Sequence, residues 1–294
     1  MNKNILSNNL SALVAMLLQV AILLLLIFLI ISSTYYRIFP YDWRNYINEN
    51  FQIEINTYSD TLRKIDIELN KNYTFESLQN VNKIYNNGIA YIWPDQINSI
   101  TLRDNWILFL AKFMDPLITE LNLQKPTTKA FTNFESYKYE RALGRGFGIC
   151  SQNAIGLSNL LNRLGNINSR VVGLNKHVVV EVELDNETLV LDPSFGVSLP
   201  FSIVHAQNNL DTVKKYYQNT DQPEIYSAYD EIGNIYIPEK GNYIYTDNHK
   251  KQKLIRNFEI LADYLSIIFP LTLILIFKNV IIKRIKFIKK LIIS

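Results

Sequence analysis

The chain has 294 residues, a formal net charge of +3, one cysteine and 48% hydrophobic residues. Its mean hydropathy is near zero because apolar runs lie at both ends, which excludes an ordinary water-soluble protein. Much of the Lys and Arg excess follows residue 250, so the chain has no basic face for nucleic acid. A single cysteine forms no intramolecular disulfide, so the thiol is either inert packing or a reagent.

The first apolar run predicts a transmembrane helix. No charged residue occurs from Asn4 to Tyr36, and LSALVAMLLQVAILLLLIFLII is long enough to cross a bilayer core of about 30 Å. A cleaved signal peptide is the alternative. It is disfavoured because the run exceeds the usual ~7 to 15 apolar residues and no A-x-A-like site follows it.

The second apolar segment, residues 261–282, contains Pro270, and its Lys278 must reach the membrane surface. The tail after it has basic residues and no acidic one, so we expect it to stay in the cytoplasm. Two spans then give a cytoplasmic-membrane protein with both termini in the cytoplasm and the domain outside. The alternative is a second segment that only lies on the membrane surface.

The expected organisation is a tail and span over residues 1–37, one domain over 38–256, and a span with a basic tail over 257–294. Within the domain the sequence predicts a helix from about Thr74 to Gly88. It also predicts a helix within residues 102–117, with these side chains in the core: Trp106, Leu108, Leu110 and Phe113.

The clearest element is a helix over residues 151–164, where leucines recur on one face and Gly165 is placed to end the helix. Three strands are expected after it, from the runs SRVVGL, HVVVEVEL and ETLVLD. Asp185 and Asn186 separate the last two runs, and both residue types tolerate the positive φ of a two-residue hairpin turn.

Cys150 precedes this helix directly, in the stretch GRGFGICSQNA. Unpaired N–H groups and the positive end of the helix dipole favour a thiolate there. The preceding glycines let another backbone approach closely, as a substrate chain requires. The alternative is a small buried apolar residue.

The hairpin supplies a base and an orienting acceptor for a nucleophilic thiol. With the Asp185–Asn186 turn, Glu183 lies opposite Thr188, and His177 and Asp192 become diagonal neighbours on one face. That spacing permits a side-chain hydrogen bond. The opposite, apolar face is expected to pack on the Cys150 helix.

Other residues offer weaker alternatives. His205 and His249 lie in less patterned surroundings, whereas Glu181 or Glu183 would be able to orient His177 in place of Asp192. No His-x-x-x-His, cysteine pair or phosphate-binding glycine loop occurs, so we expect neither a metal nor a cofactor.

Residues 144–197 resemble the core of the transglutaminase-like superfamily. The resemblance rests on a glycine and cysteine at a helix start, a helix ending in glycine, a His-bearing strand and a closing Leu-Asp-Pro. It implies an α/β (α+β), papain-like core with the nucleophile helix packed on an antiparallel sheet, here flanked by transmembrane helices. It assigns Cys150 as nucleophile, His177 as general base and acid, and Asp192 as orienter.

The chain departs from the family at Val179 and Thr188, where an aromatic residue and a tryptophan are common. The backbone N–H of Cys150 is one expected oxyanion donor. Candidates for a second donor are Trp106, Tyr137 and Tyr139. Two arginines, Arg141 and Arg145, are expected either in a solvated basic loop or on a substrate carboxylate.

The expected function is attack on an amide bond of a peptide or protein in a bacterial cell envelope, through a thioester. Water as acceptor makes the protein a peptidase or amidase, which we favour, and an amine makes it a cross-linking transferase. The alternatives are a non-catalytic binding or assembly module of the same fold, and an inert membrane protein with a structural cysteine. Besides the substrate, the lipid bilayer is the expected partner.

Overall fold

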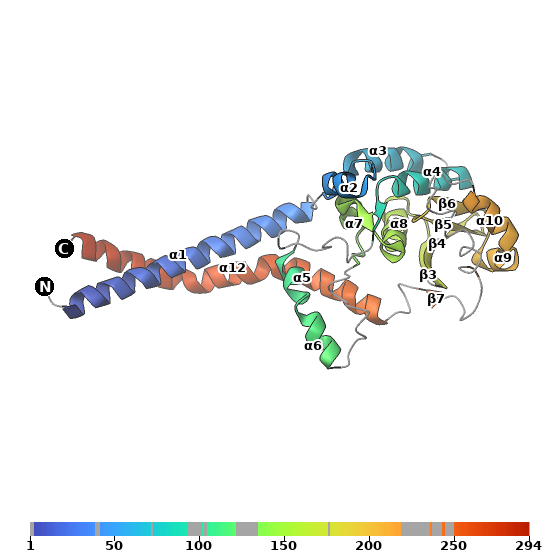
Figure 1. The fold of residues 1–294 in the computed structure, drawn as a ribbon. Helices are drawn as coiled ribbons and strands as arrows, with labels where there is room; N and C mark the ends of the chain where they lie inside the picture. The colour runs from blue at the N-terminus through green and yellow to red at the C-terminus, as the bar shows by residue number, and fades with distance from the viewer. Residues whose placement is uncertain are drawn as a thin grey trace. The chain divides into compact units, whose positions relative to one another are not determined.

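In the computed structural model the chain forms two compact units, one of residues 1–39, 100–114 and 260–294, the other of residues 40–99 and 115–259. Helices combine with an antiparallel sheet, which confirms a mixed α/β protein (Figure 1). The described residues are 3–38, 42–71, 73–92, 102, 105–121, 135–175, 177–218, 236, 243–244 and 250–293.

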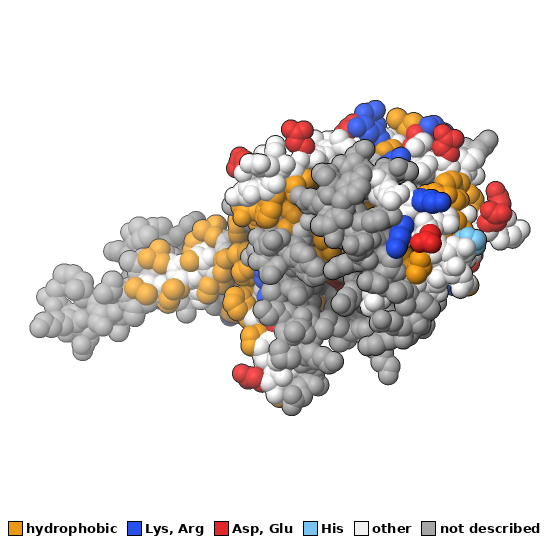
Figure 2. All heavy atoms as spheres, turned by 45° about the vertical axis from the view of Figure 1, so that its right-hand side comes forward, with side chains coloured by type: hydrophobic (Ala, Val, Ile, Leu, Met, Phe, Trp, Pro, Cys, Tyr) orange, Lys and Arg blue, Asp and Glu red, His pale blue; other side chains and the backbone are white. Residues whose placement is uncertain are grey.

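The first unit contains two long helices, α1 (Lys3–Ile38) and the greater part of α12 (Lys250–Ile293). Leu17–Tyr35 and Arg256–Lys278 are long and apolar enough to cross a membrane. Most of their side chains are exposed, and hydrophobic atoms cover the described surface of these helices (Figure 2). Pro270 lies within the second stretch without ending the helix.

Two short helices replace the single one expected over residues 102–117. Helix α5 (Trp106–Ala111) begins at Asn105, whose side chain accepts hydrogen bonds from the first backbone N–H groups, and α6 (Met114–Glu120) follows. Leu108 is buried as expected. Placing Leu110 and Phe113 in the core was wrong, because they are 49% and 70% exposed on the outer side of this segment.

The second unit begins with α2 (Arg44–Phe51), α3 (Tyr58–Leu69) and α4 (Phe75–Asn86). The predicted helix after Thr74 is confirmed, and the Thr74 hydroxyl accepts a hydrogen bond from the Ser77 backbone N–H. The helix α3 forms where the sequence has only short alternating stretches, because burial of Ile65 against the core outweighs that local pattern.

Helix α7 (Tyr139–Arg145) leads through a short strand into α8 (Cys150–Leu164). Gly165 ends α8 as predicted, with its N–H donating to the Leu161 carbonyl, although the left-handed residue is Asn166 at φ 48°. The connecting strand is β2 (Phe147–Gly148), and it pairs in parallel with β1 (Ala90–Tyr91).

All pairs in the main sheet are antiparallel, in the order β6-β5-β4-β3-β7. Asp185 and Asn186 take φ values of 50° and 68°, and Glu183 pairs with Thr188, so the predicted turn and register are confirmed. The strands are β3 (Ser169–Leu174), β4 (His177–Leu184), β5 (Glu187–Asp192), β6 (Val197–Leu199) and β7 (Tyr243–Ile244).

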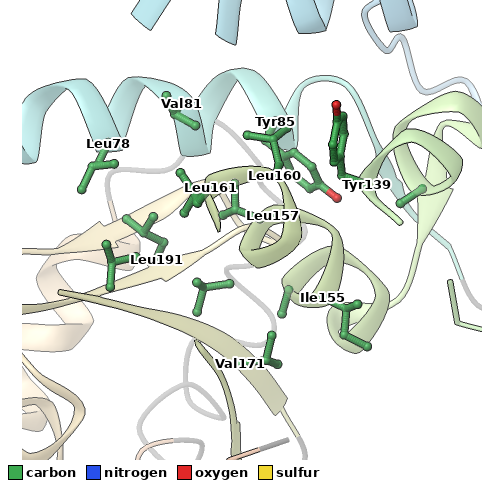
Figure 3. Close-up of a cluster of buried hydrophobic side chains, with 14 of the residues drawn as sticks. Leu78, Val81, Tyr85, Tyr139, Ile155, Leu157, Leu160, Leu161, Val171 and Leu191 are labelled. Atoms are coloured by element: carbon green, nitrogen blue, oxygen red, sulfur yellow. The ribbon is translucent and has the colours of Figure 1, made fainter. Parts of the chain in front are cut away.

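Helix α8 lies between α4 and the sheet, as Figure 3 shows for Leu157 and Leu161 between Val81 and Leu191. The apolar face of the β4–β5 hairpin packs in this core, as predicted. The other sheet face is buried as well, under α9 (Ile203–Asn208) and α10 (Leu210–Gln218). Helix α8 is therefore enclosed, and its first turn is held in place by packing rather than by local sequence.

Candidate active site

The structure brings together the three residues expected to form the site. Cys150 is the first residue of α8, His177 the first of β4 and Asp192 the last of β5. His177 Nε2 lies 2.8 Å from Asp192 Oδ2, and a side-chain hydrogen bond joins His177 to Cys150. The confirmed hairpin register is what makes His177 and Asp192 diagonal neighbours.

The electrostatics of the site keep His177 protonated. Burial alone lowers the pKa of His177, but the charge and hydrogen bond of Asp192 and the contact with Cys150 outweigh burial and raise it to about 10. Since Nε2 is bound to Asp192, Nδ1 is the ring nitrogen left for the sulfur. An imidazole bonded to a thiol on one side and to a carboxylate on the other is the arrangement of a cysteine nucleophile with its base and orienter.

Asp192 is held through both carboxylate oxygens. Besides His177, Oδ2 accepts a hydrogen bond from the Tyr217 hydroxyl at 2.7 Å, and Oδ1 accepts one from the Ser194 backbone N–H at 3.1 Å. Burial, followed by the charge of Asp192, raises the pKa of Tyr217, so this phenol remains a donor. The carboxylate therefore cannot rotate away from His177 without losing these bonds.

Tyr217 was not found from the sequence. It comes from α10, 25 residues beyond Asp192, and a second phenol, Tyr236, lies 3.0 Å from its hydroxyl. Tyr217 and Tyr236 are also buried among the apolar residues on the second face of the sheet. The helical spacing of α10 carries no signal for contact with a strand end.

An aromatic stack connects His177 with Tyr91, a second site residue that did not follow from the sequence. Phe195 stacks on His177 with ring centroids 5.3 Å apart, and Tyr91 stacks on Phe195 at 6.3 Å. The Tyr91 hydroxyl hydrogen-bonds with Cys150, and burial raises the pKa of Tyr91. Tyr91 reaches the sulfur because β1 pairs with β2, which places it beside Gly148.

Two of the glycines before Cys150 serve the packing of the chain itself. Gly146 has φ 81° and ends α7 in the left-handed conformation. A Cβ on Gly148 would lie 2.6 Å from the Asn153 side-chain oxygen, so only glycine lets β2 pass the first turn of α8. These contacts explain the glycine pattern without a bound substrate chain.

The expected aromatic oxyanion donors have other partners. Trp106 Nε1 donates to the Ser266 carbonyl at 3.0 Å in the first unit. The Tyr139 ring packs in the core and carries a guanidinium over its face, while Tyr137 lies against Lys138 and Arg256. Among the described side chains, the Tyr91 hydroxyl is the donor that reaches Cys150.

Arg141 and Arg145 do not belong to a solvated loop, which corrects that expectation. They are only 9% and 2% exposed. Arg141 Nη1 is 2.5 Å from Glu259 Oε1, and Arg145 Nη2 donates to Gln152 Oε1 at 2.8 Å. Both guanidinium groups therefore bind acceptors of this chain.

Glu259 connects the start of α12 with the start of α8. Its carboxylate accepts hydrogen bonds from Ser136 Oγ at 2.6 Å and the Tyr137 backbone N–H at 3.2 Å, besides its pair with Arg141. The Gln152 side chain in turn bonds both backbone groups of Ser136, at 2.6 and 2.7 Å. A chain of buried polar groups thus connects Glu259, near the beginning of the second apolar stretch, with Gln152 in the first turn of α8.

The alternative bases and orienters lie elsewhere. Glu181 pairs with Arg170 and Glu183 bonds Asn168, each at 2.5 Å, so Asp192 is the carboxylate on His177. His205 is exposed on α9 against Phe201, and His249 lies outside the described residues.

No family model, curated protein or solved structure matches this chain. Within the described residues, no group of three or more His, Cys, Asp or Glu side chains is arranged to hold a metal ion. Any account of function therefore depends on the geometry around Cys150.

Proposed function

We infer that this chain is a membrane-anchored cysteine enzyme of the transglutaminase-like type that cleaves an amide bond, acting as a peptidase or amidase. The observation that carries this proposal is the joined series Cys150, His177 and Asp192, with the sulfur at a helix start and a 2.8 Å bond behind the imidazole. These are the nucleophile, base and orienter of a thiol-dependent acyl transfer.

The reaction proceeds in two steps. The Cys150 thiolate attacks the amide carbonyl carbon, and the C–N bond breaks as His177 gives its proton to the leaving amine. The acyl group remains as a thioester on Cys150. Water then attacks this thioester, His177 takes the proton from the water, and release of the carboxylic acid regenerates the thiolate and imidazolium pair.

Two donors are available for the oxyanion formed in each step. The Cys150 backbone N–H belongs to the first turn of α8, where N–H groups have no partner within the helix. The Tyr91 hydroxyl is the second donor, because it already bonds the Cys150 sulfur that attacks the carbonyl carbon. Phe195 keeps the Tyr91 and His177 rings stacked.

The two apolar stretches, Leu17–Tyr35 and Arg256–Lys278, anchor the enzyme in the cytoplasmic membrane of a bacterium. The basic tail after Lys278 supports cytoplasmic termini, which leaves the domain on the outer side. On that side, peptides and proteins of the cell envelope are the available amides.

The test compares alkylation of Cys150 by iodoacetamide in the full chain, in detergent, between pH 5 and 10. Since a protonated His177 stabilises the thiolate, labelling near neutral pH should be fast in the wild type and at least ~10-fold slower in His177→Ala. The matched control is His205→Ala, an exposed histidine that should leave the rate unchanged.

The outcomes separate the candidate functions. Slow labelling that is indifferent to His177 would refute the enzyme and leave a binding or assembly module. If labelling depends on His177, peptide amides are assayed with and without an added primary amine. Release of acid without amine incorporation supports the hydrolase, whereas incorporation of the amine identifies a cross-linking transferase.

A further inference from the structure

The segment around α5 exposes a concentration of apolar side chains. Leu110 and Phe113 are exposed, as are Leu102 before the helix and Met114 after it. Between Trp106 and Met114 one side chain is charged, that of Lys112. Its ammonium group lies 5.1 Å from the Phe109 ring centroid. A surface of this kind is unfavourable in water and indicates a covering partner.

Helix α5 is bonded to the second apolar stretch itself. Helix α5 lies beside α12 in Figure 1. Asn105 Nδ2 donates to Asp263 Oδ1 at 3.1 Å, and Trp106 Nε1 donates to the Ser266 carbonyl at 3.0 Å. The Trp106 ring also contacts Phe269, with centroids 6.1 Å apart. Asn105, Asp263 and Ser266 are all buried, so these polar groups satisfy one another rather than water.

These contacts place α5 beside one short section of α12. Asp263 and Ser266 lie near the beginning of the Arg256–Lys278 stretch, a few residues after Glu259, which is bonded within the other unit. At 1.5 Å per residue, Asp263 is only about 6 Å along the helix from Glu259. Helix α5 therefore lies beside the first turns of the Arg256–Lys278 stretch.

We propose that α5 and the residues around it are a membrane-interface anchor, with Leu110 and Phe113 inserted into the outer part of the bilayer beside α12. The occupant is lipid because the exposed side chains of α5 continue those of the span to which it is bonded, including Ile268 and Phe269. Six helical residues are too short to cross a bilayer, so α5 lies in the boundary layer, where Lys112 reaches the headgroups.

This inference rests on α12 entering the membrane and is independent of the chemistry at Cys150. The test uses the full chain with Cys150→Ala, which removes the only thiol. Phe113→Cys is then labelled with a polarity-sensitive nitrobenzoxadiazole dye and reconstituted in phosphatidylcholine–phosphatidylglycerol vesicles. Spin-labelled lipids with the quencher in the headgroup, at the top of the acyl chain or at its end report the depth of the dye.

Two control positions frame the result. Val204→Cys is on exposed α9 of the soluble unit, and Leu24→Cys is exposed at the middle of the first apolar stretch. We expect the dye at Phe113 to be quenched at least ~3-fold more by a quencher at the top of the acyl chain than by one at its end. The dye at Leu24 should show the reverse order, and the dye at Val204 should show little quenching. A Leu110→Cys label should reproduce the Phe113 result.

Phe113 and Leu110 labels that behave like Val204, while Leu24 is quenched, would overturn the interface anchor alone. Disulfide-linked dimers of Phe113→Cys without lipid quenching would replace the bilayer by a second copy and also overturn it. Failure of quenching at Leu24 as well would remove the membrane anchoring on which both this inference and the localisation depend.

Discussion

Replacing Glu259 by glutamine tests whether the beginning of the second apolar stretch, where this residue lies in α12, stabilises the domain. Glu259 is fully buried and accepts from Ser136, Tyr137 and Arg141. Glutamine keeps the volume but removes the charge, so the buried Arg141 guanidinium loses its ion pair with Glu259. Breaking a buried ion pair in this way costs about 3 to 5 kcal/mol.

That loss corresponds to a fall in Tm of roughly 6 to 20 °C for a domain of this size. The assay is thermal unfolding of the full chain in detergent, followed by tryptophan fluorescence, with Cys150 alkylation at 25 °C as a second readout. The matched control is Glu68→Gln, whose surface pair with the exposed Lys71 is worth at most about 1 kcal/mol.

A double variant sharpens the test. If the loss comes from breaking the Arg141–Glu259 ion pair, Arg141→Met combined with Glu259→Leu should recover much of the stability that Glu259→Gln loses, because an apolar pair buries no charge. A Tm for Glu259→Gln within about 2 °C of the wild type would refute the reasoning, since a fully buried carboxylate in three hydrogen bonds cannot be neutralised at so small a cost.

Four further predictions concern the site and the topology. Asp192→Asn should lower kcat by roughly 10²- to 10⁴-fold without unfolding the domain, because His177 loses its charged acceptor; unchanged turnover on a peptide amide would remove Asp192 from the mechanism. Tyr91→Phe keeps the stack on Phe195 but loses the hydroxyl, so kcat should fall about 10²-fold with little change in KM; a kcat equal to that of the wild type would remove Tyr91 as an oxyanion donor. The pKa of His177 is raised from 6.5 to about 10, so its contribution to stability is complete below about pH 6.5 and is lost as the pH rises through 10. The midpoint of urea unfolding should therefore fall more steeply between these pH values in the wild type than in Asp192→Asn. Equal slopes for the two proteins would contradict this. A reporter fused after Ser294 should be active only in the cytoplasm, and an exported reporter would reverse the topology.

The β4–β5 hairpin is the part of the site that could be predicted from short-range sequence patterns. A two-residue turn and alternating side chains are sufficient to set the register of β4 and β5, so the His177–Asp192 pair followed from the sequence. The start of α8 at Cys150 followed in the same way, because helix periodicity and a terminal glycine are local signals.

The remaining site residues come from long-range contacts. Tyr91 reaches Cys150 only because β1 pairs with β2, and Tyr217 reaches Asp192 only because α10 covers the second face of the sheet. Local sequence carries no information about either approach. Arg141 was likewise expected in a solvated loop or on a substrate carboxylate, since its partner Glu259 is 118 residues away.

The sequence by itself determined the apolar stretches at both ends, the helix that begins at Cys150 and the hairpin that aligns His177 with Asp192, because each depends on periodicity or turn chemistry over a few residues. Only the tertiary structure decided which phenols reach the thiol and the carboxylate, that Glu259 is bonded to α7 and the residues before it, and that α5 is bonded to the second apolar stretch. These contacts join segments far apart in the chain, and their stability comes from burial that no single segment can provide.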